Sequence, residues 1–217
     1  MEPTSGLRNL LSEMEISAES NSAVQLLHYL RILEKWNARM NLTARTEWSA
    51  LRPLFCESIW SSRRYPADAT NHLDIGSGAG FPAIILKILL PQIHLDVVES
   101  RGKKGAFLET VAHALEMKET HVHVERLDAL LDRCDRAKTW DCVSWKGIRL
   151  SSRDLLDLRR HTNDRTQFWM FHGREPAVES PNVLEEYFTL LRQEKSPENR
   201  DWKLSIYVVK QSGVRSR

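Results

Sequence analysis

Three glycines at alternate positions, Gly76, Gly78 and Gly80, follow directly after a short apolar segment. Residues 71–75 predict a β-strand, and the apolar residues 84–90 predict a helix after the turn. Glycine adopts positive φ angles easily, and its lack of a Cβ atom lets a ligand approach the backbone closely. The helix N-terminus that follows favours an anionic or carboxylate group, because its first N–H groups are unpaired. The segment therefore predicts a site for a nucleotide or a nucleotide-like cofactor.

Two carboxylates near these glycines narrow the choice of cofactor. The dinucleotide fingerprint reads G-x-G-x-x-G, whereas this chain reads G-x-G-x-G with Asp74 just before it. A carboxylate there would repel a pyrophosphate and would suit the ammonium group of S-adenosylmethionine. Glu99 closes the next apolar segment, residues 93–98, where an acidic side chain can accept hydrogen bonds from ribose hydroxyls. The alternative is an ordinary tight turn, with Glu99 serving only to cap the following helix.

The chain after the turn alternates between strand and helix patterns, which predicts a parallel sheet with right-handed crossovers. A ligand of such a sheet lies beyond the carboxyl ends of the strands, where Gly76, Glu99, Asp128 and Lys146 would gather. Two final strands, the first of which could begin as a helix, predict a terminal antiparallel hairpin, unlike a dinucleotide fold. The expected elements are strand 93–98, helix 103–117, strands 121–125, 140–144 and 167–171, and the final pair 183–191 and 203–209.

The N-terminal part of the chain is expected to be helical. Residues up to about 20 are a short helix or a loose arm, and apolar periodicity predicts two helices, one from residue 21 to about 40 and one over 47–64. We expect residues 1–66 to form a small cap beside the cleft and residues 67–217 to form the main domain. A basic row on the first of the two helices either holds RNA phosphates or is a solvated surface; it consists of Arg31, Lys35 and Arg39.

Composition excludes several classes of protein. At 217 residues and a net charge of +2, the chain can form one good core but has no overall positive field for nucleic acid, so RNA contacts must be local. The three cysteines are too widely spaced to predict disulfides or a zinc site, and His121 and His123 lack a third ligand. With no apolar leader and no membrane span in the sequence, we expect a cytoplasmic protein without a metal.

The assembled motifs resemble the RsmG (GidB) family of 16S ribosomal RNA guanine-N7 methyltransferases. Residues 35–43 reproduce the family signature K-W-N-x-x-x-N-L-T, and residues 74–82, 99–104 and 107–108 continue the match in order, so that the resemblance covers about residues 21–210. It implies a class I methyltransferase fold that binds S-adenosylmethionine. The implied partner is 16S ribosomal RNA or the 30S subunit, and we expect the protein to be a monomer.

The resemblance carries site roles to individual positions. Gly76 and Phe81 would line the cofactor site, Leu127 and Asp128 would flank the adenine, and the family's arginine is retained as Arg126. Together with the residues named above, the expected cofactor-binding set is Asp74, Gly76, Ser77, Gly78, Gly80, Phe81, Glu99, Ser100, Arg126, Leu127, Asp128 and Lys146.

Three segments around the expected substrate pocket depart from the family pattern. Trp145-Lys146-Gly147 replaces Ser-Arg-Ala, His172-Gly173 replaces Lys-Gly, and Leu54-Phe-Cys-Glu57-Ser58 replaces His-x-x-Asp-Ser. The lysine exchanges a planar guanidinium for a point charge. Trp145 could stack on a splayed base or pack in the core. The expected RNA-contacting residues are Arg31, Lys35, Arg39, Glu57, Trp145 and His172.

Guanine N7 carries a lone pair and no proton, so methyl transfer needs alignment rather than a general base. Good alignment alone can supply about 7–11 kcal/mol. We expect Lys146 and Asp128 to be the catalytic residues, with Asp128 or Glu57 supporting the positive charge of the product ring. Two alternatives stay open: a divergent module that binds the cofactor without transferring methyl groups to this RNA, and a nicotinamide-dependent oxidoreductase.

Overall fold

The computed structural model describes residues 1–40, 42–43, 45–135, 137–199 and 201–210. Asn41 of the signature and residues 211–217 at the end of the expected main domain lie outside these ranges.

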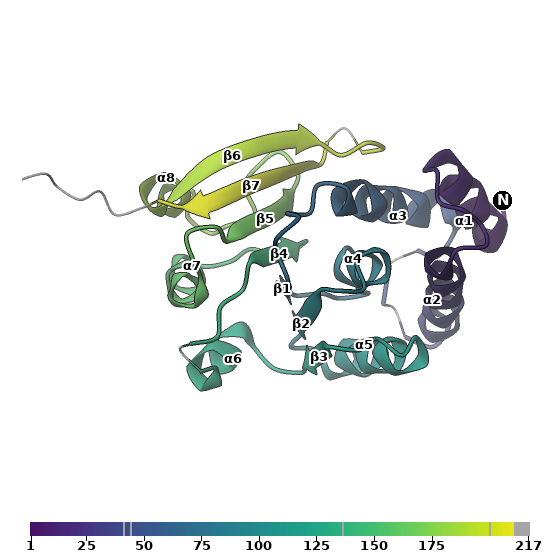
Figure 1. Ribbon diagram of the computed structural model, residues 1–217, viewed down its shortest axis with the longest axis horizontal. Coiled ribbons are helices and arrows are strands. Elements are labelled where there is room, and N and C mark those ends of the chain that lie inside the picture. The colour runs from purple at the N-terminus through teal and green to yellow at the C-terminus, as the bar shows by residue number, and fades with distance from the viewer. Residues whose placement is uncertain (41, 44, 136, 200, 211–217) are drawn as a thin grey trace, which may run out of the picture.

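A seven-stranded sheet in the order β3-β2-β1-β4-β5-β7-β6 crosses the described part of the chain (Figure 1). The first five of these strands run parallel, and β7 pairs antiparallel with both β5 and β6. This arrangement confirms the expected parallel sheet with a terminal antiparallel hairpin. The strands are β1 Asn71–Ile75, β2 His94–Val98, β3 Thr120–His123, β4 Cys142–Lys146, β5 Gln167–His172, β6 Phe188–Lys195 and β7 Lys203–Val209.

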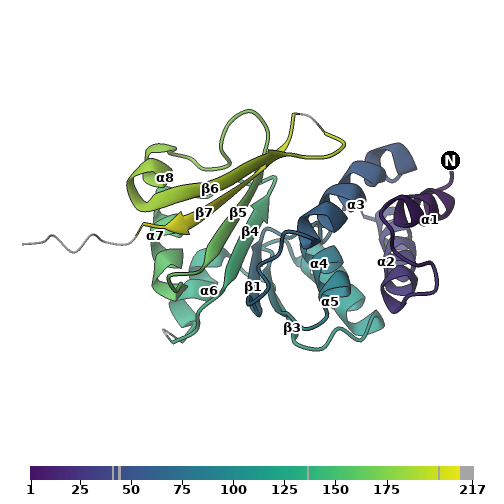
Figure 2. The same ribbon diagram turned by 45° about the horizontal axis from the view of Figure 1, so that its top comes forward.

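Helices cover both faces of the sheet, including α6 and α7, which the sequence analysis did not name. One side carries α1 Pro3–Glu13, α2 Asn21–Asn37, α3 Trp48–Ser62, α4 Ala83–Leu89 and α5 Gly102–Ala114; the other carries α6 Leu127–Arg133, α7 Ser152–Leu158, the short 3-10 helix Arg159–His161 and α8 Asn182–Tyr187 (Figures 1 and 2). Each side has its own apolar core. The first core joins α1–α5 to Leu95 and Val97 of β2, so the N-terminal helices pack together with helices of the sheet domain.

The first 20 residues contain a packed helix, the first of the two expected possibilities. Leu7, Leu10 and Leu11 of α1 are almost fully buried. Gly6 lies against the ring of Trp48, where a Cβ atom would come within 2.5 Å of the indole. The close approach of α1 to α3 explains why so short and weakly patterned a segment is ordered.

Several boundaries differ from the sequence expectation, and two of them bear on the site. The fourth strand is Cys142–Lys146 instead of 140–144, so Lys146 is its last residue and pairs with Phe171. Helix α2 ends at Asn37, which places Arg39 beyond the helix that carries Arg31 and Lys35. Residues 182–187 are helical before β6 begins, which was the alternative that the sequence left open.

The cysteines are free, as their spacing predicted. Within the described ranges, no helix is long and apolar enough to cross a membrane. The same residues contain no group of three or more His, Cys, Asp or Glu side chains placed to hold a metal ion.

Candidate functional site

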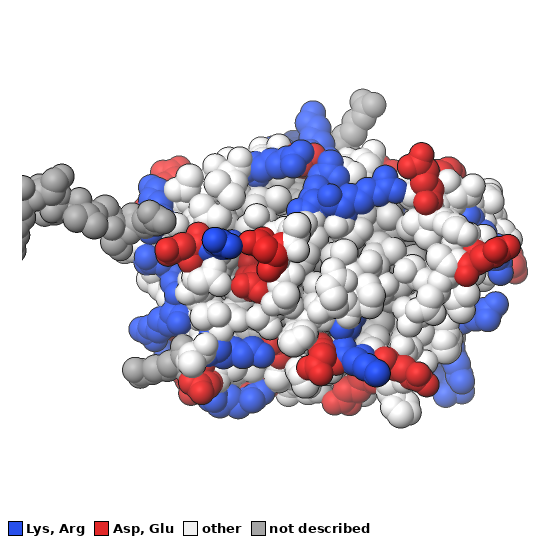
Figure 3. All heavy atoms as spheres, viewed as in Figure 1, with Lys and Arg blue, Asp and Glu red and all other residues white. Residues whose placement is uncertain are grey.

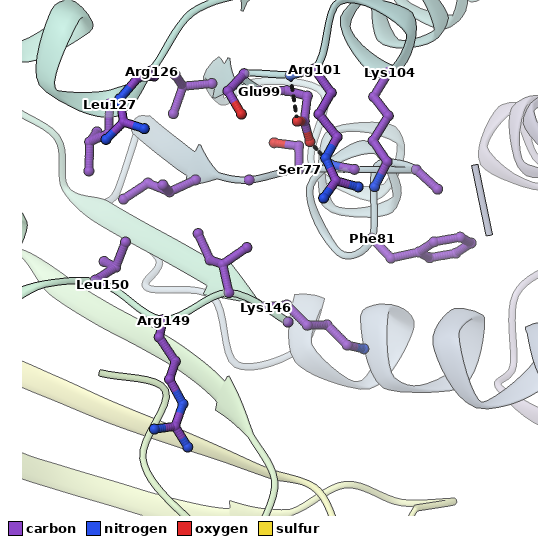
Figure 4. A pocket seen from close by; sticks show the side chains of 18 of the residues that line it. Ser77, Phe81, Glu99, Arg101, Lys104, Arg126, Leu127, Lys146, Arg149 and Leu150 are labelled. Atoms are coloured by element: carbon purple, nitrogen blue, oxygen red, sulfur yellow. Dashed lines mark hydrogen bonds between the residues drawn. The ribbon is translucent and has the colours of Figure 1, made fainter. Parts of the chain in front are cut away.

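A cleft of about 590 Å³ lies beyond the carboxyl ends of β1, β2 and β4 (Figure 4). Its volume is in the range of small-molecule and cofactor sites. The cleft brings together most of the expected cofactor-binding residues, namely Gly76, Ser77, Gly78, Phe81, Glu99, Ser100, Arg126, Leu127, Asp128 and Lys146. Asp74 and Gly80 do not line it.

The glycine turn has the backbone that the sequence predicted. Gly76, Gly78 and Gly80 adopt φ angles of 69°, 59° and 90°, all in the region that side chains disfavour. Gly80 acts in packing rather than in the cleft wall, because a Cβ atom there would lie 2.5 Å from a side-chain carbon of Ile84. A Cβ atom on Gly78 would make only ordinary contacts, with Lys104 Nζ at 3.6 Å and the Gly76 carbonyl oxygen at 3.7 Å, so its positive φ is the main demand for glycine there.

Two backbone N–H groups fix the position of the Glu99 carboxylate in the cleft. Its Oε2 accepts a hydrogen bond from the Gly78 N–H at 3.0 Å, and its Oε1 accepts one from the Arg101 N–H at 2.9 Å (Figure 4). The side chain is only 6% exposed. A carboxylate oxygen has two acceptor sites, so each oxygen keeps one for a ligand hydroxyl. The two backbone bonds thus orient Glu99 and leave it able to accept further hydrogen bonds.

Asp74 lies under the floor of the cleft instead of in its wall. It is 2% exposed, and Ser144 Oγ donates a hydrogen bond to its carboxylate. Burial raises the pKa of Asp74 to about 7, although the Ser144 and Ser77 hydroxyls partly oppose the shift. The direct contact with a ligand ammonium that the sequence predicted is therefore corrected to an influence from below the turn.

A buried polar row connects Asp74 to His72. The hydroxyl of Ser144 lies 2.8 Å from His72 Nε2. Tyr65 stacks on the imidazole with a centroid distance of 5.6 Å. Burial lowers the pKa of His72 to about 3, so this imidazole is neutral at physiological pH. Its Nδ1 has no hydrogen-bond partner among the described residues.

Lys146 reaches the other end of the cleft and pairs with Glu57 of α3. The two side chains retain 13% and 3% exposure. The Lys146 ammonium also lies 5.4 Å from the centroid of the Trp202 ring and 5.8 Å from that of Phe171. The family departures at Lys146 and Glu57 are therefore joined in one ion pair, which the sequence could not reveal because the two residues are 89 positions apart.

The expected base-stacking residue Trp145 belongs to the core. It is 0% exposed, and its Nε1 donates to the Ala177 carbonyl at 2.9 Å. Successive side chains of a strand point to opposite faces of the sheet. Because Lys146 faces α3, Trp145 points to the opposite face. The stacking interpretation is wrong and the core interpretation is correct.

His172 is also buried, at 4% exposure. Its Nε2 lies 2.8 Å from Ser205 Oγ, and its Nδ1 lies 3.1 Å from the Glu175 carbonyl oxygen. Burial lowers the pKa of His172, which disfavours a charged contact with phosphate. The expectation of a direct RNA contact is replaced by a structural role in holding the segment after β5.

The two expected catalytic residues are not adjacent. Leu127, next to Asp128 in the chain, and Lys146 lie at opposite ends of the cleft (Figure 4). Asp128 is half exposed and pairs with Arg126 at 3.3 Å. It is placed to meet a ligand at the β2–β3 end, where the resemblance put the adenine, and not at the Lys146 end.

The basic row Arg31, Lys35 and Arg39 is exposed, but none of its members lines the cleft. Three cations that the sequence analysis did not single out line the cleft itself, namely Arg101, Lys104 and Arg149 (Figure 4). Arg101 and Lys104 belong to the motif 99–104, which was the available signal. On the face in Figure 3, charges of both signs are interspersed around a broad uncharged region, in keeping with the net charge of +2.

Comparison with known proteins places this chain in a family. The family model described as rRNA small subunit methyltransferase G matches residues 22–198. A ribosomal RNA small subunit methyltransferase G from Roseiflexus sp. is 34% identical over 75% of this chain and 67% of its own length. The corresponding proteins of Bacillus velezensis and Chloroflexus aggregans are 34% and 39% identical, over 65% and 61% of this chain. The chain spans 60% and 56% of the length of these two relatives.

Solved structures share the fold at low sequence identity. An O-methyltransferase from Bacillus cereus in complex with SAH has a TM-score of 0.61 and 15% identity, covering 84% of this chain and 91% of that one. A ribosomal protein L11 methylase from Lactobacillus delbrueckii subsp. bulgaricus has a TM-score of 0.52 and 16% identity, covering 71% and 77%. The expected class I methyltransferase fold is thus confirmed. With the family model covering most of its residues, the chain belongs to the rRNA small subunit methyltransferase G family.

Proposed function

We propose that this protein uses S-adenosylmethionine to methylate N7 of a guanine in 16S ribosomal RNA. The observation that carries the proposal is the Glu99 carboxylate, fixed by the Gly78 and Arg101 N–H groups at the tip of β2. It faces an open cleft that extends to the Lys146–Glu57 pair. Membership of the family supports the same activity.

The residues of the cleft suit the cofactor. Glu99 accepts hydrogen bonds from the ribose hydroxyls, and Leu127 and Asp128 flank the adenine. Arg126, Ser100, Ser77 and Phe81 complete the walls. Gly76 and Gly78 line the cleft without side chains, so a ligand can approach their backbone. Asp74 favours the cofactor's ammonium group from beneath the turn, since a cation nearby stabilises the ionised form of a buried carboxyl. The bound cofactor supplies an electrophilic methyl group.

Lys146 is the residue we assign to the acceptor base. An ammonium group has three donors, and one of those on Lys146 is directed at Glu57. Lysine donates readily to O6 of guanine, which leaves N7 free to attack the methyl carbon. Glu57 balances the ammonium charge while the guanine ring becomes positive. Since N7 loses no proton, the task of these residues is alignment.

The N-terminal residues 1–66 act as a cap over the acceptor end, because Thr43 and Leu54 line the cleft and α3 supplies Glu57. The exposed cations Arg31, Lys35 and Arg39 bind RNA phosphates beside it. The protein acts as a cytoplasmic monomer on 16S RNA or on the 30S subunit.

Methyl incorporation from labelled S-adenosylmethionine tests the proposal. The acceptors are 30S subunits and naked 16S RNA from a strain that lacks the enzyme, and the labelled nucleoside is identified by mass spectrometry. We expect 7-methylguanosine in at least one of them. A protein that binds S-adenosylhomocysteine but labels neither would refute the activity. Calorimetric binding of NAD in place of S-adenosylhomocysteine would favour an oxidoreductase.

The Glu99→Ala variant tests the central contact. Loss of hydrogen bonds to two ribose hydroxyls should weaken S-adenosylhomocysteine binding by about tenfold or more, since hydrogen bonds to charged groups contribute about 1.5–3 kcal/mol. Glu109→Gln, on an exposed part of α5, is the matched control and should bind normally. Equal affinities of the two variants would contradict the assignment of Glu99.

A further inference from the structure

A second hollow of about 430 Å³ lies beside the cofactor cleft. Gly147, Ile148 and Arg149 line both hollows. The remaining wall consists of residues 171–177, after and at the end of β5, and of Trp202 before β7. We call this hollow the Trp202 pocket, with residues 147–149, 171–177 and Trp202 as its lining. Because only one short loop separates it from the cleft, a single extended ligand can occupy both.

The lining combines an aromatic ring with two cations on opposite loops. Trp202 is partly exposed, and the side chains of Arg149 and Arg174 are exposed. Arg149 pairs with Glu175 at 3.1 Å, but the two side chains are 58% and 77% exposed, and such surface pairs are easily replaced. An indole face beside guanidinium groups is the combination that binds a splayed base and its phosphate in single-stranded RNA.

The indole of Trp202 is held in place before any ligand arrives. Its ring lies 5.4 Å from the Lys146 ammonium, which Glu57 in turn fixes. The backbone N–H of Trp202 donates to the Asn199 carbonyl at 2.9 Å, and its carbonyl accepts from the Ser196 N–H at 2.9 Å. A side chain that is already ordered loses little conformational entropy on binding.

The opposite wall of the pocket is also tied down. His172 links the carbonyl of Glu175 to the hydroxyl of Ser205 on β7, at 3.1 and 2.8 Å. The Ala177 carbonyl accepts from the Trp145 indole on the core side at 2.9 Å. His172 and Trp145, two of the three buried residues for which the sequence predicted RNA contact, thus hold the backbone of residues 175–177 in place.

We propose that the Trp202 pocket binds a splayed nucleotide of single-stranded RNA next to the methylated guanine. The base stacks on Trp202, and the adjoining phosphates bind Arg149 and Arg174. The identity of the neighbouring guanine rests on the proposed function, whereas RNA binding by the pocket is measurable without methyl transfer.

Fluorescence anisotropy measures RNA binding by the full chain saturated with S-adenosylhomocysteine. Two variants of Trp202 are compared, and in both the new side chain fills most of the space of the indole. Trp202→Phe keeps an aromatic face and Trp202→Leu removes it. The probe is a mixed-sequence single-stranded oligoribonucleotide of about 12 nucleotides, within the length that such grooves cover. We expect Trp202→Leu to bind it about tenfold more weakly than Trp202→Phe. A hairpin duplex of the same length should bind weakly to both and show no difference.

Arg174→Ala should weaken binding of the single strand several-fold. Arg165→Ala is its matched control, because Arg165 is exposed and precedes β5 at the opposite edge of the sheet. All variants should keep the wild-type affinity for S-adenosylhomocysteine, and in methylation assays the losses should appear in the KM for RNA more than in kcat.

Equal RNA affinity of Trp202→Leu and Trp202→Phe would overturn the proposal that the Trp202 pocket binds RNA. If Trp202→Leu does not fold, equal RNA affinity of Arg174→Ala and Arg165→Ala would overturn it. The two proposals can fail separately. Absence of methylation, with RNA binding that depends on Trp202, would refute the proposed function alone; normal methylation with equal RNA affinity of all variants would refute the pocket alone.

Discussion

Lys146 at the end of β4 and Glu57 in α3 form an ion pair that is largely removed from solvent, with 13% and 3% of the side chains exposed. The pair joins the carboxyl edge of the sheet to the N-terminal helices. Because each charge has lost most of its hydration, each depends on the other. The Lys146 end of the cleft and the packing of α3 against the sheet are thereby coupled.

Replacing Glu57 alone should therefore destabilise the protein. Glu57→Gln leaves the Lys146 ammonium without a counter-charge, and we expect a loss of about 3 kcal/mol in the free energy of unfolding, at the lower end for broken buried pairs. Urea-induced unfolding measures this loss in the free energy of unfolding. The double variant Glu57→Leu with Lys146→Met removes both charges and should lie within about 1 kcal/mol of wild type, yet transfer methyl groups poorly. Equal destabilisation by Glu57→Gln and by Glu13→Gln, in an exposed pair with Arg52, would contradict the coupling.

Asp74 and His72 should impose opposite pH dependences on stability. Burial raises the pKa of Asp74 from 3.8 to about 7, so its stabilising protonated form is lost as pH rises through that range. Burial lowers the pKa of His72 from 6.5 to about 3, so stability is lost as pH falls through that range. Between about pH 4 and 6.5 the two slopes, each up to about 1.4 kcal/mol per pH unit, should largely cancel in the wild-type protein.

Single substitutions at Asp74 and His72 reveal the pH dependence of stability that the other group contributes. Asp74→Asn should become less stable relative to wild type as pH falls from 6.5 towards 4, because the His72 contribution then acts alone. His72→Asn should show the reverse, becoming relatively less stable as pH rises. Urea unfolding at several pH values measures both. Parallel stability curves for the two variants would show that these groups do not titrate as the burial implies.

Alanine variants of three glycines distinguish the cost of backbone strain from the cost of steric contact. Gly80→Ala combines a φ of 90° with a contact of 2.5 Å to Ile84 and should cost more than 2 kcal/mol, since strain and overpacking each cost about 1–2 kcal/mol. Gly147→Ala has a φ of 71° but no atom within 4 Å, so about 1 kcal/mol is expected. Gly102→Ala, without either problem, should be neutral or stabilising by about 0.5 kcal/mol. Thermal unfolding ranks them, and any other order would contradict the turn geometry.

Local motifs were sufficient to predict which residues meet at the carboxyl ends of β1 and β2. Gly76, Gly78 and Glu99 lie within short motifs, where residue spacing along the chain dictates the turn and the strand tip, whereas Leu127 was assigned from the family resemblance. The order of strand and helix patterns likewise predicted the parallel sheet and its terminal hairpin. These features depend on contacts between residues close in sequence and on the periodicity of apolar side chains, both of which can be read without the fold.

The acceptor end depended on tertiary structure. Alternation along β4 places Trp145 and Lys146 on opposite faces, but only the packing of the sheet decides that Lys146 faces α3 and Trp145 the core on the other side. The Lys146–Glu57 pair and the meeting of Trp202 with Arg149 join residues far apart in the chain. Asp74 has the type and spacing of a ligand residue, yet the packing of Ser144 and His72 around it leaves it below the floor. Such contacts form only when the sheet brings its strands together, so no local pattern in the sequence encodes them.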